Sequence, residues 1–149
     1  MYPRTARTFC TRWSMRSRPG TRLTRVGFTY SGIRRGLYMS LYESEYFAAT
    51  AVHAGSLRPE TYPLIAFAKR KIPIFIMVGT ADPFFPLAEV RATRDELAKH
   101  GLTVQLTEIP NHNHWYYDLA PKINRDAWDF LKKYELSADP RYEQYQFKK

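Results

Sequence analysis

The sequence of 149 residues predicts one α/β domain built on a mostly parallel sheet with flanking helices. Residues 72–78 form a continuous apolar, β-branched run, which is typical of a strand buried on both faces of a parallel sheet. Segments with strand character alternate with segments of helical period, and this order favours parallel strands joined by crossovers. A hydrophobic content of 44% is enough to build a core.

Shorter patterns predict the elements before this run. Residues 26–30 are compatible with a short strand, and the apolar spacing over 37–44 indicates a short helix. Residues 47–52 indicate a buried strand that is closed by turn residues. Residues 60–70 are predicted to be helical in spite of an internal proline.

Proline and glycine mark the elements that follow. Pro86 is placed to open a helix that Gly101 ends, in agreement with the preferences of these two residues. Residues 104–109 predict another strand, and Pro121 is placed to open the last helix. The polar tail from Ser137 is expected on the surface.

The formal charge of +9 lies entirely in the first quarter of the chain. Residues 1–36 contain nine arginines, no lysine and no acid, whereas residues 37–149 contain 14 basic and 14 acidic side chains. The first segment has no helical or strand period, and its composition is similar to that of organelle transit peptides. We therefore divide the chain at residue 36 and expect the first segment to be disordered.

A basic nucleic-acid-binding protein is an alternative from another functional class. Aromatic residues such as Trp13 and Phe28 lie among the arginines and are able to stack on bases. However, the arginines follow no helical face and no known binding motif is present, so we do not expect a nucleic-acid partner.

Several other classes are excluded on composition. The single cysteine, Cys10, excludes an internal disulfide and a cysteine-rich zinc site. The sequence shows no apolar run long enough for a membrane span, no secretory signal and no glycine-rich phosphate loop, so we expect no membrane partner and no cofactor. The compartment stays open, with the cytoplasm as the default expectation.

Two polar loops follow neighbouring strands of the predicted sheet. Residues 79–83 contain Asp82, and residues 111–118 contain His112 and His114. Because the carboxyl ends of parallel strands meet at one edge, an aspartate and a histidine from these loops can form a hydrogen bond. Such a carboxylate fixes the imidazole tautomer in nucleophilic hydrolases.

Simpler interpretations of these residues stay open at this point. Asp82 precedes a proline and is a good turn residue in its own right. His112 and His114 are solvated loop residues or a metal-binding pair, but no third ligand follows at close spacing, so we expect no metal. His53 ends its predicted strand and is expected to line a pocket rather than to act in catalysis.

Residues 74–86 resemble the strand and acid loop of the α/β-hydrolase superfamily, and residues 108–117 resemble its histidine loop. The subgroups that they resemble most are serine esterases of the dienelactone hydrolase, polyhydroxybutyrate depolymerase and prolyl oligopeptidase-like kinds. The resemblance covers about residues 37–135. It implies a partial α/β-hydrolase fold, in which residues 37–149 form the C-terminal part of the domain.

The resemblance also implies roles for individual residues. Asp82 corresponds to the acid of a catalytic triad, and His114 to the base, because related esterases have a histidine followed by aromatic residues in a similar setting. His112 is the alternative base. Loop position places His53, together with Trp115 and Tyr116, at a substrate pocket.

The nucleophile departs from the family pattern. Ser31 lies where the nucleophile of Gly-x-Ser-x-Gly is expected, but Thr29 and Ile33 replace the two glycines and crowd a strained turn. One choice of codons for residues 26–36 encodes, in another frame, a strand followed by Gly-His-Ser-Ala-Gly. An out-of-frame first segment would therefore explain both its composition and the missing elbow, and the nucleotide sequence of the gene decides this hypothesis.

The resemblance implies a carboxylic ester hydrolase that acts on a small-molecule ester or amide. We expect this chain to be a truncated or frameshifted form with little activity of its own. A sheet that lacks its earlier strands has an open edge, through which self-association is expected. A non-catalytic, hydrolase-like interaction module is a further alternative.

Overall fold

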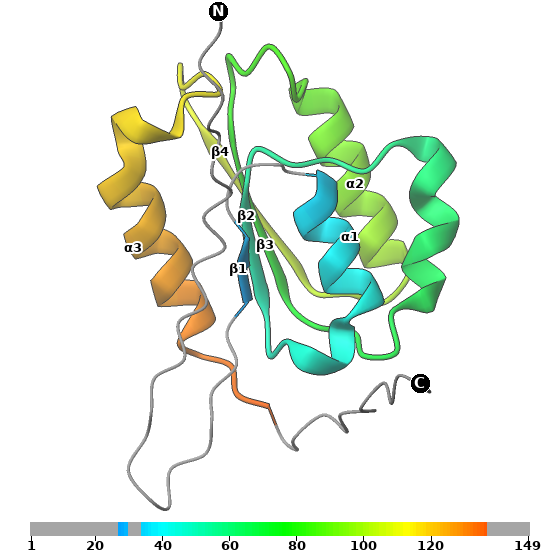
Figure 1. Cartoon of the computed structure of the whole chain (residues 1–149). Coiled ribbons are helices and arrows are strands. Elements are labelled where there is room, and N and C mark those ends of the chain that lie inside the picture. Colours follow the sequence, from blue (N-terminus) through cyan, green and yellow to red (C-terminus); the bar gives the residue numbers. More distant parts are fainter. Residues whose placement is uncertain (1–26, 30–33, 137–149) are drawn as a thin grey trace, which may run out of the picture.

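The computed structural model describes residues 27–29 and 34–136, whose four strands form one parallel sheet (Figure 1). Along the sheet, the strands follow their order in the chain: β1 (Gly27–Thr29), β2 (Thr50–His53), β3 (Ile74–Gly79) and β4 (Val104–Ile109). All three pairings are parallel, so the four carboxyl ends lie at the same edge. The predicted α/β class is confirmed.

Helices cover both faces of this sheet (Figure 1). The α-helices α1 (Arg34–Tyr42) and α2 (Leu87–Lys99) lie on one face with the 3₁₀ helix η2 (Pro59–Phe67), and α3 (Ala120–Leu131) covers the other. Two shorter 3₁₀ helices, η1 (Ser44–Tyr46) and η3 (Tyr116–Leu119), lie in the connections.

The central strand β3 explains why the core has two halves. All six of its residues are buried. Ile74 and Ile76 pack in the cluster under α1 and α2, whereas Phe75 and Met77 pack in the cluster under α3. Successive side chains of a strand point to opposite faces, so an uninterrupted apolar run is what a strand between two helical layers requires.

The observed elements differ from the predicted ones mainly at their ends. The strand predicted over 47–52 begins at Thr50, and the helix predicted over 60–70 is the 3₁₀ helix η2. Pro63 lies inside η2 and has no N–H to donate to an i−4 carbonyl, which disfavours a regular α-helix there. The last helix begins one residue before Pro121, at Ala120.

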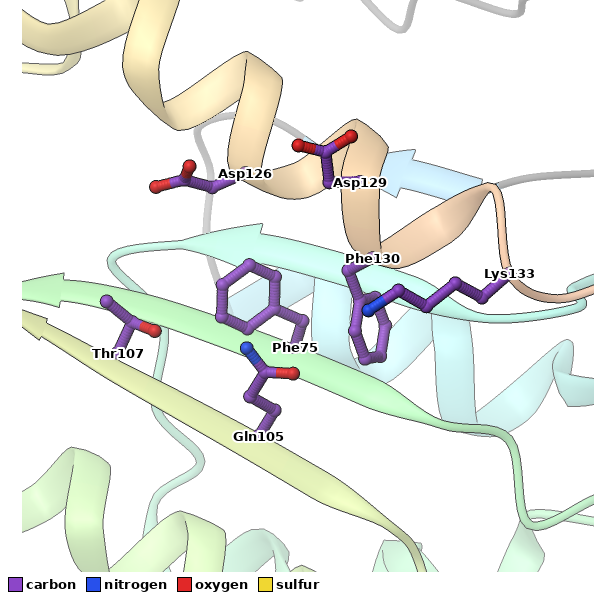
Figure 2. A pocket seen from close by; sticks show the side chains of 7 residues that line it. All are labelled: Phe75, Gln105, Thr107, Asp126, Asp129, Phe130 and Lys133. Atoms are coloured by element: carbon purple, nitrogen blue, oxygen red, sulfur yellow. The ribbon is translucent and has the colours of Figure 1, made fainter.

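An open groove lies on the α3 side of β4 (Figure 2). The rings of Phe75 and Phe130 face each other there with their centroids 5.2 Å apart, and Gln105 of β4 and Lys133 lie beside them. This groove contains none of the candidate site residues, which lie at the carboxyl edge of the sheet.

Predictions that concern residues 1–26, 30–33 and 137–149 lie outside the described residues. The division at residue 36, the out-of-frame segment and self-association through a sheet edge all stay predictions. Within the described part of the chain, no helix has the length and apolar character that crossing a membrane requires.

Candidate functional site

Asp82 is held in a tight turn directly after β3. Its backbone N–H donates to the carbonyl of Gly79 at 3.2 Å. Its carboxylate oxygen Oδ1 accepts hydrogen bonds from the N–H groups of Phe84 at 2.8 Å and Phe85 at 3.1 Å. The side chain is 0% exposed. Asp82 is therefore a turn residue, as its position before proline suggests, and its second oxygen stays available for another partner.

That partner is His114. Its Nδ1 lies 3.0 Å from Oδ2 of Asp82. The imidazole is edge-on to the ring of Phe84, with centroids 5.0 Å apart, and stacked on Phe85 at 5.7 Å. A carboxylate accepts only, so Nδ1 carries the proton and the neutral ring has its lone pair on Nε2. With 29% of its side chain exposed, His114 is accessible to a reactant.

Hydrogen bonds fasten the histidine loop (residues 111–118) to the aspartate loop (residues 79–83). The N–H of Ala81 donates to the carbonyl of His112 at 3.0 Å, and the N–H of Asn111 donates to Oγ1 of Thr80 at 2.9 Å. Asn111 has a φ of +56°, in the left-handed region that asparagine tolerates better than most residues. The distance between the acid and the base is thus set by the two loops as a unit.

The two loops can come this close because Gly79 has no side chain. A Cβ atom at this position would lie 2.0 Å from the carbonyl oxygen of His112 and 2.9 Å from that of Asn113. Gly79 is not among the site residues that the sequence predicts. The available signal was a glycine at the last position of a strand otherwise made of large apolar residues.

A pair of buried histidines, His53 and His112, lies beside the contact between Asp82 and His114. His53, at the end of β2, and His112 are 3% and 6% exposed, with their Nε2 atoms 3.2 Å apart. The pKa of His53 is lowered to about 4, mainly by burial and to a smaller extent by the neighbouring His112 and His114, while Asp82 acts in the opposite direction. His53 is therefore neutral at physiological pH.

The structure brings most of the predicted site residues to one edge. The ring of Tyr116 lies 6.0 Å from that of His53, and Trp115 is 58% exposed next to Tyr117. Asp82 contacts His114, whereas the ring of His112 contacts His53. Ser31 lies outside the described residues. No group of three or more metal-ligating side chains occurs in the ranges 27–29 and 34–136.

The low pKa of His53 predicts an acid-sensitive fold. As pH falls from 6.5 toward 4, the unfolded chain takes up a proton at His53 that the folded chain does not bind. The contribution of neutral His53 to the free energy of unfolding is therefore at its maximum above pH 6.5, and it falls by up to about 3 kcal/mol by pH 4. Urea denaturation at several pH values measures this loss. His53→Gln is expected to show a shallower pH dependence, and an unchanged slope would contradict the assignment.

Comparison of the sequence with models of protein families finds a match to one family. The model of the dienelactone hydrolase family matches residues 6–138, which include most of the arginine-rich segment. No curated protein matches the chain.

Solved structures share this fold at low sequence identity. Esterase PE8 is 23% identical with a TM-score of 0.58, and the match covers 72% of this chain and 48% of that one. TT1662 from Thermus thermophilus is 19% identical with a TM-score of 0.54, covering 74% and 55%. SOBER1 from Arabidopsis thaliana is 18% identical with a TM-score of 0.52, covering 71% and 51%. The chain thus spans about half the length of these structures, and it has the α/β-hydrolase fold over that part.

Proposed function

Because this chain belongs to the dienelactone hydrolase family, we propose that its site supplies the acid and the base of a carboxylic ester hydrolase. The observation that carries this proposal is the 3.0 Å contact between the buried carboxylate of Asp82 and Nδ1 of His114. This contact occurs at the carboxyl edge of a parallel sheet, where ligands of such sheets bind. The substrates are small-molecule esters.

The chemistry follows from the tautomer that Asp82 imposes. Nε2 of His114 accepts the proton of a serine hydroxyl as that oxygen attacks the ester carbonyl, and then returns it to the leaving alkoxide. The carboxylate of Asp82 stabilises the imidazolium that forms in between. Backbone N–H groups would hold the oxyanion, one of them from the residue after the nucleophile.

Ser31 is the candidate nucleophile, since the chain order serine, aspartate, histidine is that of α/β-hydrolases. In the sequence, it lies between the end of β1 at Thr29 and the start of α1 at Arg34. In the sequence, Thr29 and Ile33 occupy the two positions at which the family motif has glycines. We therefore propose that this chain alone has little or no ester turnover.

Hydrolysis of 4-nitrophenyl acetate tests this proposal. The chain is expected to give a rate close to the buffer blank, with no further loss in Ser31→Ala. The double variant Thr29→Gly, Ile33→Gly removes the crowding at the turn and is expected to raise the rate measurably. Adding His114→Gln is expected to abolish that gain, because the base is lost.

The matched control is His100→Gln, which removes a histidine at the end of α2, away from the site. It is expected to leave the gain of the double variant unchanged. Two results would refute the proposal: clear turnover by the unmodified chain that disappears in Ser31→Ala, or a rate in the double variant that does not depend on His114.

A further inference from the structure

The buried histidine pair spans three strands of the sheet. His53 belongs to β2, His112 follows β4, and β3 lies between these two strands. The contact between their Nε2 atoms at 3.2 Å therefore passes over the carboxyl end of β3, where Gly79 begins the aspartate loop. The proposed mechanism of ester hydrolysis uses neither ring.

His112 is held from two sides. Its carbonyl accepts the N–H of Ala81 and lies against the Cα of Gly79, so its backbone is fastened to the aspartate loop. Its side chain is fastened to β2 by His53. Only one residue separates His112 from His114, so a rotation of the backbone at His112 would move the ring of His114 relative to Asp82.

The contact between the two rings depends on their protons. A hydrogen bond between two Nε2 atoms needs an N–H on one ring and a lone pair on the other. Two neutral rings of complementary tautomers meet this condition, and so does one imidazolium beside one neutral ring. Two imidazolium rings do not, because both Nε2 atoms then carry hydrogens and positive charge in a site that water hardly reaches.

We propose that His53 is a positioning residue that clamps His112 and thereby holds His114 on Asp82, and that acid opens this clamp by protonating both rings of the pair. The inference rests on the proposed roles of Asp82 and His114. The groups that face His53 are His112, His114, Tyr116 and Asp82. Burial disfavours the charged form of His53 most strongly, and of these groups only Asp82 favours it, so the neutral form persists until the solution is distinctly acidic.

The test uses ¹⁵N NMR of the imidazole rings in the full chain, between pH 8 and pH 3.5. In the unmodified chain, we expect a hydrogen-bonded Nδ1–H on His114 at neutral pH and its loss as pH approaches 4. His53→Phe keeps an aromatic ring at this position but cannot form a hydrogen bond with His112, so its His114 signal is expected to be lost or exchange-broadened already at pH 7. His53→Gln offers an amide that does not titrate, and it is expected to retain the signal at pH 7 and to a lower pH than the unmodified chain.

Amide proton protection in β3 shows whether each variant is folded, and His100→Gln is the matched control that leaves the pair untouched. A His114 signal in folded His53→Phe equal to that of the unmodified chain would overturn the proposal. A His53→Gln variant that loses the signal at the same pH as the unmodified chain would also overturn it. A missing Nδ1–H signal in the unmodified chain is a different result, because it would contradict the Asp82–His114 contact and hence the proposed function itself.

Discussion

Replacing Gly79 with alanine is expected to destabilise the fold by about 3 kcal/mol and to separate the two loops of the site. The added Cβ would lie 2.0 Å from the carbonyl oxygen and 2.5 Å from the carbonyl carbon of His112. Both are backbone atoms, which cannot rotate away as the end of a flexible side chain can. Chemical denaturation measures the loss of stability, and the Nδ1–H signal of His114 reports the separation.

Gly101→Ala is the matched control for this substitution. Gly101 lies two residues after the end of α2 and has a φ of +82°, and no other atom lies within 4 Å of the Cβ that alanine would add. Its cost is backbone strain alone, about 1 kcal/mol, with no effect on His114. Equal losses of stability in the two variants would show that close packing of the loops at Gly79 has no special importance.

Loss of the Asp82 carboxylate is expected to have the second large effect. Asp82→Ala leaves the N–H groups of Phe84 and Phe85 and Nδ1 of His114 without their acceptor. A buried donor left unsatisfied costs about 1–3 kcal/mol. The donor of Phe85 is buried, whereas those of Phe84 and His114 are partly buried, so we expect a total loss of about 3 kcal/mol in the free energy of unfolding. Denaturation in urea measures it.

Asp82→Asn separates the turn from the chemistry, because the amide oxygen can still accept from the turn while its nitrogen faces His114. We expect a smaller loss of stability, about 1 kcal/mol, and a shift of the neutral His114 ring toward the tautomer protonated on Nε2. The ¹⁵N shifts of the ring measure that change. Asp118→Asn, an exposed aspartate near His114 in the chain, is the control and is expected to change neither property. An unchanged His114 tautomer in Asp82→Asn would refute the assigned role of the carboxylate.

The sheet could be predicted from the sequence because the composition of β3 is compatible with few arrangements other than a strand buried on both faces. A continuous apolar run such as Ile74–Gly79 is stable only when both faces are covered, and this requirement places helices on both sides of it. The ends of the elements were harder to predict. Residues 47–49 are as apolar as a strand, but the ladder with β3 begins at Thr50, and pairing across the sheet is not visible in a local pattern.

The contact between Asp82 and His114 could be anticipated, since the order of strands and the meeting of their carboxyl ends are properties of the topology. The partner of His112 could not be anticipated in the same way. His53 is 59 residues away in the chain, and its ring meets that of His112 because the end of β2 and the loop after β4 lie on either side of the carboxyl end of β3. Likewise, the need for glycine at position 79 arises from a backbone that arrives from another loop.

The joined loops have a consequence for how this edge can vary. One of the two hydrogen bonds that set their spacing joins main-chain atoms of Ala81 and His112, which every residue type supplies, apart from the N–H that proline lacks. The other uses the side-chain hydroxyl of Thr80. Exchanges of side chain at many loop positions are therefore compatible with the same geometry, whereas adding or deleting one residue between Ile109 and His114 would shift the imidazole out of register with its carboxylate. The loops at this edge of the sheet are therefore expected to tolerate substitutions at many positions, but not insertions or deletions.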